Sequence, residues 1–470
     1  MKILSRIRQS KDTQSSAWFM FCNILQKGIA FITVPIFTRM MSTSEYGEFS
    51  VFQSWIQIFT IFTSLNIAYG VLNKALTEFD DADHFVSCSQ MLYSINTILI
   101  FGIVSVVNFG IYNFLKLPPY IVVLMFVELM IAPALAIYSV KGRFFLKYKK
   151  AVVLTILLSV LNPIVGILFV RFSLEKGIAR IIAYLLVEIV ICGIVYFAHF
   201  IRGGNPFSKK YFSYILKVSL PLIPLFLSSV ILNQSDKIMI GNLVSEEAAA
   251  IYSVAYSIAM IMKILNESVN ASFIPWLYKK IKTGDTSSIQ KITNYLVIGT
   301  ALANIMVILF SKEAVLLIGS QKYIDAVAIM PILTISVFLM FVISIFNNIE
   351  IYYNKNKYIA FVSILIAIIN LVLNYVGITN FGFQAAAYTT AICYAISLFL
   401  HIIFVNKSIK EANGLYNGLL ICVVSFFLIA ISFVTPWLYG FLRVRISIGL
   451  SIFAIIYVFF KKRVFINEKQ

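Results

Sequence analysis

The chain has 470 residues, of which 60% are hydrophobic and 12% are charged, with a mean hydropathy of +0.91 and a formal charge of +18. Soluble domains are usually about half apolar and about one quarter charged, so this composition excludes a water-soluble globular enzyme. The apolar residues form blocks of roughly 17 to 25, the length that a helix needs to cross a hydrocarbon core of about 30 Å. The sequence therefore predicts an all-α polytopic membrane protein.

Polar interruptions divide the chain into fourteen predicted spans, whose ends are set to within about four residues. In chain order they are 16–38, 47–69, 88–112, 119–140, 151–170, 178–200, 214–240, 249–273, 290–311, 327–350, 359–377, 384–405, 415–437 and 444–460. The connections are too short for a soluble domain on either side. The basic start precedes no small-residue cleavage site, so we expect the first span to be retained.

The Lys and Arg residues are distributed unequally between the predicted loops. About 26 of the 38 lie on the side of the two termini, and about 9 lie on the opposite side. Cytoplasmic loops carry the excess of these residues, so we expect both termini to be cytoplasmic. The same distribution accounts for most of the positive charge, and nucleic acid is not an expected partner.

A short internal match suggests two lobes. Residues 47–54 in the second span match residues 250–257 in the eighth, at an offset of six spans. An even offset makes the two copies parallel, as in transporters built from parallel repeats. We predict an N-lobe at 1–210 and a C-lobe at 211–412, each of six helices, around a central cavity. Residues 413–470 then hold two extra helices and a cytoplasmic tail.

Polar side chains at helical spacing are expected to line that cavity. The second span carries a polar stripe, and the matching face of the eighth span carries two charges and two amides. A charge at mid-bilayer costs roughly 2.5 to 3.5 kcal/mol on insertion scales, so such residues rarely face lipid. The predicted substrate-binding residues are Lys27, Lys237, Lys263, Asn23, Gln53, Gln57, Thr60, Asn266 and Asn270. Two acids, Asp236 and Glu267, are candidates for coupling to an ion.

The same charges also allow a structural interpretation. Lys263 and Glu267 are four residues apart and can neutralise each other, and Asp236 can pair with Lys237. Glu350 can extend its carboxylate to the membrane interface. Both interpretations remain open at the level of the sequence.

Enzyme chemistry has little support in the sequence. The three histidines, His84, His199 and His401, lie at span edges without the spacing of metal ligands. A phosphate-binding loop of the GxxxxGK[ST] type is absent from the sequence. We therefore expect neither a metal nor a cofactor.

Two segments resemble the signatures of a known family. Residues 35–39 (Pro-Ile-Phe-Thr-Arg) followed by 44–47 (Ser-Glu-Tyr-Gly) resemble the opening of bacterial polysaccharide repeat-unit flippases, the Wzx-type exporters of O-antigen and capsule. Residues 219–224 (Ser-Leu-Pro-Leu-Ile-Pro) and 234–241 (Gln-Ser-Asp-Lys-Ile-Met-Ile-Gly) are similar to the start of that family's second lobe. The family is part of the multidrug/oligosaccharidyl-lipid/polysaccharide exporter superfamily. The resemblance covers the whole chain in length and number of spans.

The resemblance implies a V-shaped transporter of the bacterial cytoplasmic (inner) membrane. It would move an undecaprenyl-diphosphate-linked oligosaccharide between leaflets by alternating access, driven by an ion gradient. Family cavities are cationic, which fits Lys27, Lys237 and Lys263. Members often carry Arg after the span-seven Asp and His after the Ser-Leu-Pro-Leu-Ile-Pro run, where this chain has Lys237 and Leu225. The implied partners are the lipid-linked oligosaccharide, membrane lipids, a proton or sodium ion, and a polysaccharide polymerase.

Three alternatives remain open at this point. A drug or cation exporter of the same superfamily would need acidic residues to dominate the cavity. A membrane-embedded polysaccharide polymerase or ligase commonly has a long external loop with catalytic Arg or His, whereas the longest external connection here is predicted near 312–326 and contains no His. A structural membrane protein would leave the polar stripes without a role.

Overall fold

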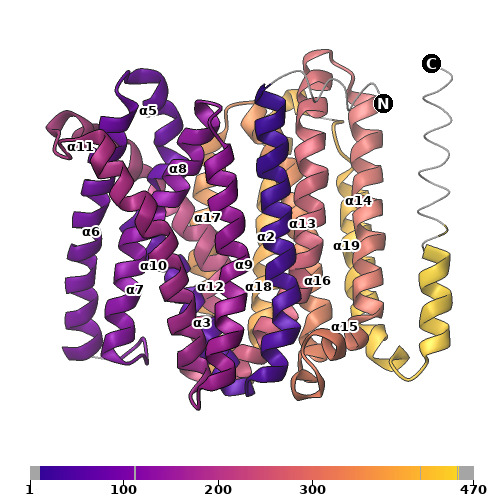
Figure 1. Cartoon of the computed structure of the whole chain (residues 1–470). Helices are drawn as coiled ribbons and strands as arrows, with labels where there is room; N and C mark the ends of the chain where they lie inside the picture. Colours follow the sequence, from indigo (N-terminus) through magenta and orange to yellow (C-terminus); the bar gives the residue numbers. More distant parts are fainter. Residues whose placement is uncertain (1–10, 111–112, 413, 453, 455–470) are drawn as a thin grey trace. The chain divides into compact units, whose positions relative to one another are not determined.

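A computed structural model describes residues 11–110, 113–412, 414–452 and 454. Helices account for nearly all of these residues, and none of the described residues forms a strand (Figure 1). The predicted all-α membrane class is thereby confirmed. The chain forms two compact units, Met1–Glu247 and Ala248–Gln470.

The first unit is built around α10. Its elements are α2 (Lys11–Met40), α3 (Thr43–Thr63), α4 (Ile67–Gly70), α5 (Leu72–Glu78), α6 (Ala82–Gly110), α7 (Pro119–Ile131), α8 (Pro133–Phe144), α9 (Lys149–Phe172), α10 (Lys176–Gly203), α11 (Lys209–Ser219), η1 (Leu220–Leu222) and α12 (Ile223–Leu243). Within this unit α10 packs against α3, α6, α7, α8 and α9, and α12 packs along α3. These contacts bury part of the surface of α10 and of the helices around it, while apolar side chains such as Ile98, Ile103 and Val190 remain exposed.

The second unit is built around α16. Its elements are α13 (Glu246–Lys282, which begins in the first unit), α14 (Thr286–Leu309), α15 (Ser311–Ile318), η2 (Gln321–Tyr323), α16 (Ala326–Tyr352), α17 (Asn356–Phe381), α18 (Ala385–Ser408), η3 (Lys410–Ala412) and α19 (Gly418–Leu438). α16 packs against α14, α15, α17, α18 and α19, and 89% of its most apolar 18-residue stretch is buried. A helix that is mostly apolar and buried on nearly every side suits this central position.

The structure supports a many-spanning topology. Within the described ranges, eleven helical segments are long and apolar enough to cross a membrane. α2 and α3 coincide with the first two predicted spans but are not among the eleven. The last predicted span, 444–460, lies partly outside the described residues. The total of fourteen therefore stays a prediction.

Prolines divide two of the predicted spans. The span predicted at 119–140 breaks at Ala132, and Pro133 begins α8. In the seventh span the 3₁₀ turn η1 contains Pro221, and Pro224 lies in the first turn of α12. Proline lacks the backbone donor that would continue the preceding helix and is tolerated in a first turn, which accounts for both breaks. A proline alone does not determine a break, because Pro35 and Pro163 lie inside α2 and α9.

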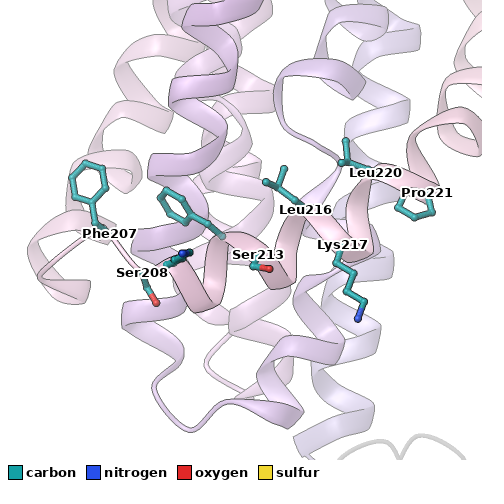
Figure 2. Close-up of a pocket in the computed structure, with 9 residues that line it drawn as sticks. Phe207, Ser208, Ser213, Leu216, Lys217, Leu220 and Pro221 are labelled. Atoms are coloured by element: carbon teal, nitrogen blue, oxygen red, sulfur yellow. The ribbon is translucent and has the colours of Figure 1, made fainter.

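Next to the second break, α11 and η1 line an open groove of about 820 Å³ (Figure 2). The lining begins just before α11, runs along that helix and ends in η1. It consists of Phe207, Ser208, Lys209, Phe212, Ser213, Leu216, Lys217, Leu220 and Pro221. The helix is amphipathic, because its cations and serines alternate with large apolar side chains.

Several contacts hold the start of α3. Ser42 Oγ accepts a hydrogen bond from Glu45 N at 3.2 Å, and Glu45 Oε2 accepts one from Ser42 N at 2.7 Å, which forms a capping box. Glu45 Oε1 also accepts from Lys176 N at the start of α10, at 3.1 Å. Ser44 Oγ donates to Glu246 Oε2 at 2.8 Å. Residues 44–47, which are part of the first resembling segment, thus lie where α3 meets α10 and the first turn of α13.

Candidate substrate-binding clusters

Polar side chains of α3 and α12 meet in the first unit. Gln234 Nε2 donates to Gln57 Oε1 at 2.8 Å, while Gln234 Oε1 accepts from Ser54 Oγ at 3.1 Å and from Lys237 Nζ at 3.4 Å. Gln234 and Ser54 are buried, Lys237 is half-buried and Gln57 is exposed. We call these four residues the α3–α12 cluster. Amide, hydroxyl and ammonium groups of this kind hydrogen-bond both phosphate and sugar hydroxyls.

The other predicted residues of α3 and α12 differ in their surroundings. Asp236 is 2% exposed and precedes Lys237 on α12. Thr60 Oγ1 donates to Ile56 O at 2.7 Å, so its hydroxyl hydrogen is used in a bond within α3. Gln53 is half-buried on α3. The structure therefore brings together Gln57 and Lys237 and leaves Thr60 bonded within α3.

Lys27 lies on α2, which packs chiefly against α9. The lysine is exposed. Asn23 is helical, but its side chain lies outside the described residues. Their assignment to a substrate cavity stays a prediction.

In the second unit, α13 and α16 share asparagines. Asn348 Nδ2 donates to Asn270 Oδ1 at 2.7 Å, and Asn266 Nδ2 lies 3.5 Å from the carbonyl of Val337. We call Asn266, Asn270 and Asn348 the α13–α16 cluster. Lys263 lies on the same helix as the two predicted asparagines and is half-buried. Each unit thus carries one group of amides with a lysine on the same helix.

Asn348 and Gln234 are not among the predicted site residues. Both are amides within apolar segments and are now found to pair with predicted residues. The sequence shows only that both are amide residues in apolar segments. A buried amide in a membrane helix needs a hydrogen-bond partner, so this residue type was the available signal. Their partners depend on which helices pack together, and one sequence does not show that.

α10 carries a buried cation that is also absent from the predicted site. Arg180 is 6% exposed, and its guanidinium carbon lies 4.5 Å from the ring centres of Phe37 and of Phe49. Arg180 Nη2 donates to Asn162 Oδ1 at 2.9 Å. Gly166 leaves room for the guanidinium, because a Cβ there would lie 2.8 Å from Nη1. Two aromatic faces and an amide thus compensate part of the cost of burying this charge.

Glu350 corrects one structural interpretation of the sequence. Its expected extension to the membrane interface is wrong, because the residue is 0% exposed on α16. Its Oε1 lies 2.8 Å from His401 Nδ1 on α18. A buried carboxylate needs such a partner. The pair therefore links α16 to α18 within the second unit.

Comparisons with known proteins agree on a family. The model of a family described as "Polysaccharide biosynthesis protein" matches residues 13–281. The chain is 29% identical over 202 residues to the Lsg locus putative protein 1 of Haemophilus influenzae, which covers 40% of this chain and 49%, about half, of that relative. It is 21% identical over 423 residues to the probable low-salt glycan biosynthesis flippase Agl15 of Haloferax volcanii, with 89% and 88% covered.

Solved structures show the same fold. The lipid II flippase MurJ in an inward closed conformation superposes with a TM-score of 0.69 at 14% identity, over 95% of this chain and 99% of that chain. At this identity the likeness concerns the fold alone.

Proposed function

Because the chain belongs to the polysaccharide biosynthesis protein family, as the match over residues 13–281 establishes, we propose that it carries a lipid-linked oligosaccharide across the membrane. We place it among the multi-pass membrane transporters of the multidrug/oligosaccharidyl-lipid/polysaccharide exporter superfamily. Within that class we propose a flippase whose substrate is an undecaprenyl-diphosphate-linked repeat unit. The proposed location is the bacterial cytoplasmic membrane, and a polysaccharide polymerase is the proposed downstream partner.

The α3–α12 cluster is the observation that supports this proposal most directly. A diphosphate and its sugars cannot cross hydrocarbon alone, because burying polar and charged groups without partners costs several kcal/mol each. The cluster joins Lys237 and Gln57 through Gln234, within helices whose residues are mostly apolar. Such groups can replace part of the water around a head group, while the polyprenyl tail remains in lipid.

The α13–α16 cluster supports the same role in the second unit. Its asparagines can hydrogen-bond sugar hydroxyls, and Lys263 adds a positive charge on the same helix. We propose that Lys27, Lys237 and Lys263 bind the diphosphate and that the amides bind the sugars. A drug or cation exporter would require the opposite charge preference.

The test is a transport assay with the purified full-length protein in vesicles that carry a lipid-linked oligosaccharide. We expect Lys263→Ala to lower the initial rate of transfer between leaflets by at least about tenfold, because a charge-assisted contact to the diphosphate is worth about 1.5 to 3 kcal/mol. The measurement is the fraction of oligosaccharide that an impermeant lectin reaches with time.

The matched control is Lys282→Ala, which removes an exposed lysine from the last turn of the same helix. It should transport at the wild-type rate and insert equally well. A normally inserted Lys263→Ala variant with wild-type transport would contradict the assigned role of Lys263. If vesicles containing the wild-type protein transported an organic cation but no oligosaccharide, that result would contradict the proposed function itself.

A further inference from the structure

A basic pocket of about 400 Å³ lies between α8, α9 and α10 of the first unit. It is separate from the α3–α12 cluster, because none of the four cluster residues lines it. Cations, rings and an apolar wall make up its lining, which consists of Tyr138, Lys149, Lys150, Val153, Leu154, Ile194, Val195, Ala198, His199 and Arg202. The pocket therefore combines positive charge with a lipid-like surface.

The three cations come from two helix ends. Lys149 and Lys150 form the start of α9, and Arg202 lies in the last turn of α10. All three are exposed, and within the described part of the chain none of them has a carboxylate within 4.0 Å. The nearby Lys141 differs, because it forms an ion pair with Asp83. Among the described residues, the lining of the pocket contains no Asp or Glu that would neutralise these three cations.

His199 adds a buried polar atom to the same pocket. Gln90 Nε2 donates to Tyr196 O at 2.6 Å, and Gln90 Oε1 therefore faces His199 Nδ1 at 2.9 Å. An amide oxygen only accepts, so Nδ1 carries the hydrogen of that bond. His199 is 4% exposed, and its Nε2 has no hydrogen-bond partner among the described residues. This nitrogen can accept from a hydroxyl or, when the ring is protonated, donate to a phosphate.

The apolar wall lies toward the middle of the two helices. Val153 follows Lys150 by about one helical turn, and Ile194 precedes Arg202 by about two turns. Val153 and Ile194 are 62% and 65% exposed. Proceeding from the helix ends inward, the pocket changes from cationic to apolar. A molecule that matches both parts has an anionic head and a hydrocarbon tail.

We propose that this pocket binds the phosphate of an anionic phospholipid such as phosphatidylglycerol. Lys149, Lys150 and Arg202 contact the phosphate, His199 Nε2 bonds the head group, and an acyl chain lies against Val153 and Ile194. Basic pockets between membrane helices are suited to anionic head groups, and each nearby cation adds attraction to an anionic lipid. The bound lipid is an accessory ligand, distinct from the transported molecule.

The experiment uses the delipidated full-length protein in neutral detergent, with lipid binding measured by native mass spectrometry. The probes are short-chain phosphatidylglycerol, short-chain phosphatidylcholine and inorganic phosphate. We expect phosphatidylglycerol to bind at least about tenfold more tightly than phosphatidylcholine, and inorganic phosphate at equal concentration not to displace it. Tenfold tighter binding by the lipid than by the free anion separates a lipid site from a phosphate site.

Variants on two helices test the assigned residues. We expect the double variant Lys149→Gln/Lys150→Gln to weaken phosphatidylglycerol binding by about tenfold, and Arg202→Gln to weaken it by about fivefold. The matched control, Lys279→Gln/Lys282→Gln, removes two exposed cations from the end of α13 and should bind as the wild type does.

Three results would overturn the proposal. Unchanged phosphatidylglycerol binding by the Lys149→Gln/Lys150→Gln variant would remove the pocket as the site. An equal loss in the α13 control would show a general response to surface charge. Displacement of the lipid by inorganic phosphate at equal concentration would show a site for a soluble anion.

Discussion

At the scale of single residues, the second unit contains a buried guanidinium held by one carboxylate. Arg445 is 1% exposed, and its Nη1 and Nη2 donate to Glu313 Oε2 and Oε1 at 2.7 and 2.8 Å. Its other bonds go to the carbonyls of Leu309, at 2.9 Å, and Tyr439, at 3.1 Å. These donated bonds hold the pKa of the Glu313 carboxyl below its ordinary value of 4.5. The ion pair therefore stabilises the folded chain only while Glu313 is ionised.

The contribution of the Arg445–Glu313 ion pair to stability should depend on pH. A lowered pKa contributes stability above the ordinary value of 4.5, and that contribution is lost as the pH falls through the lower folded value. We expect Glu313→Gln to lower the free energy of unfolding by about 2 kcal/mol at pH 7, because it leaves a buried charge without its partner. The difference from the wild type should shrink at pH values well below 4.5. Thermal unfolding in detergent at several pH values measures it.

Glu247→Gln is the matched control, since Glu247 is exposed in the first turn of α13. It should unfold like the wild type at every pH. A Glu313→Gln effect of the same size at pH 7 and pH 3 would contradict a contribution from the ionised carboxylate.

Residue types in the candidate site were accessible from the sequence, whereas their partners were not. Gln57 could be predicted because polar residues recurred on one face of a helix, and Lys237 because a cation is rare in an apolar span. Their shared contact, Gln234, depends on the packing of α3 against α12. Arg180 lies near a span end, where a cation usually remains in water, so nothing in the sequence indicated that it is buried.

At the scale of elements, Gly47 allows α3 to approach the start of α13 closely. A Cβ at this position would lie 1.9 Å from the carbonyl oxygen of Glu246, which is a backbone atom and cannot turn aside. The neighbouring bond from Ser44 to Glu246 fixes the same approach. The glycine of segment 44–47 is therefore required by packing between two backbones.

We predict opposite effects of alanine at two glycines of the first unit. Gly47→Ala should lower the free energy of unfolding by about 1 to 3 kcal/mol, because α3 must move away from Glu246. Gly102→Ala is the control, since a Cβ on Gly102 in α6 meets no atom within 4 Å. It should raise stability by up to about 1 kcal/mol through helix propensity alone. Thermal unfolding of both variants decides the point, and a Gly47→Ala variant as stable as Gly102→Ala would contradict it.

The apolar period predicted most spans, but it did not predict their breaks equally well. α9 and α10 match 151–170 and 178–200 within a few residues at each end. The predicted span 119–140 agrees with the single apolar helical segment Pro119–Phe144, but hydropathy does not indicate its division into α7 and α8, because apolar residues lie on both sides of Pro133. Hydropathy measures the environment of a segment, whereas a break depends on which carbonyl the proline ring obstructs.

At the scale of the whole molecule, net transport against a concentration difference requires a source of free energy. Asp236, 2% exposed on α12, and Glu267, exposed on α13, are the proposed coupling carboxylates. We expect an imposed proton or sodium gradient to speed wild-type transport severalfold in vesicles, since one decade of gradient supplies about 1.4 kcal/mol per ion. Asp236→Asn or Glu267→Gln should abolish this acceleration.

The control is again Glu247→Gln, which should respond to the gradient as the wild type does. Wild-type transport that is indifferent to both gradients would rule out this form of coupling. A response retained in both carboxylate variants would move the coupling site elsewhere in the chain.

The turn η1 bears on how the chain fits membranes of different thickness. An uninterrupted helix over Lys209–Leu243 would be about 52 Å long, whereas the hydrocarbon core is about 30 Å thick. With the interruption, the 21 residues of α12 alone extend about 32 Å, and α11 can change its inclination independently. We expect hydrophobic mismatch to be relieved at the 3₁₀ turn Leu220–Leu222, where the α-helical hydrogen-bond pattern is interrupted. A thinner or thicker bilayer would then change the inclination of α11 more than that of α12, which is packed along α3.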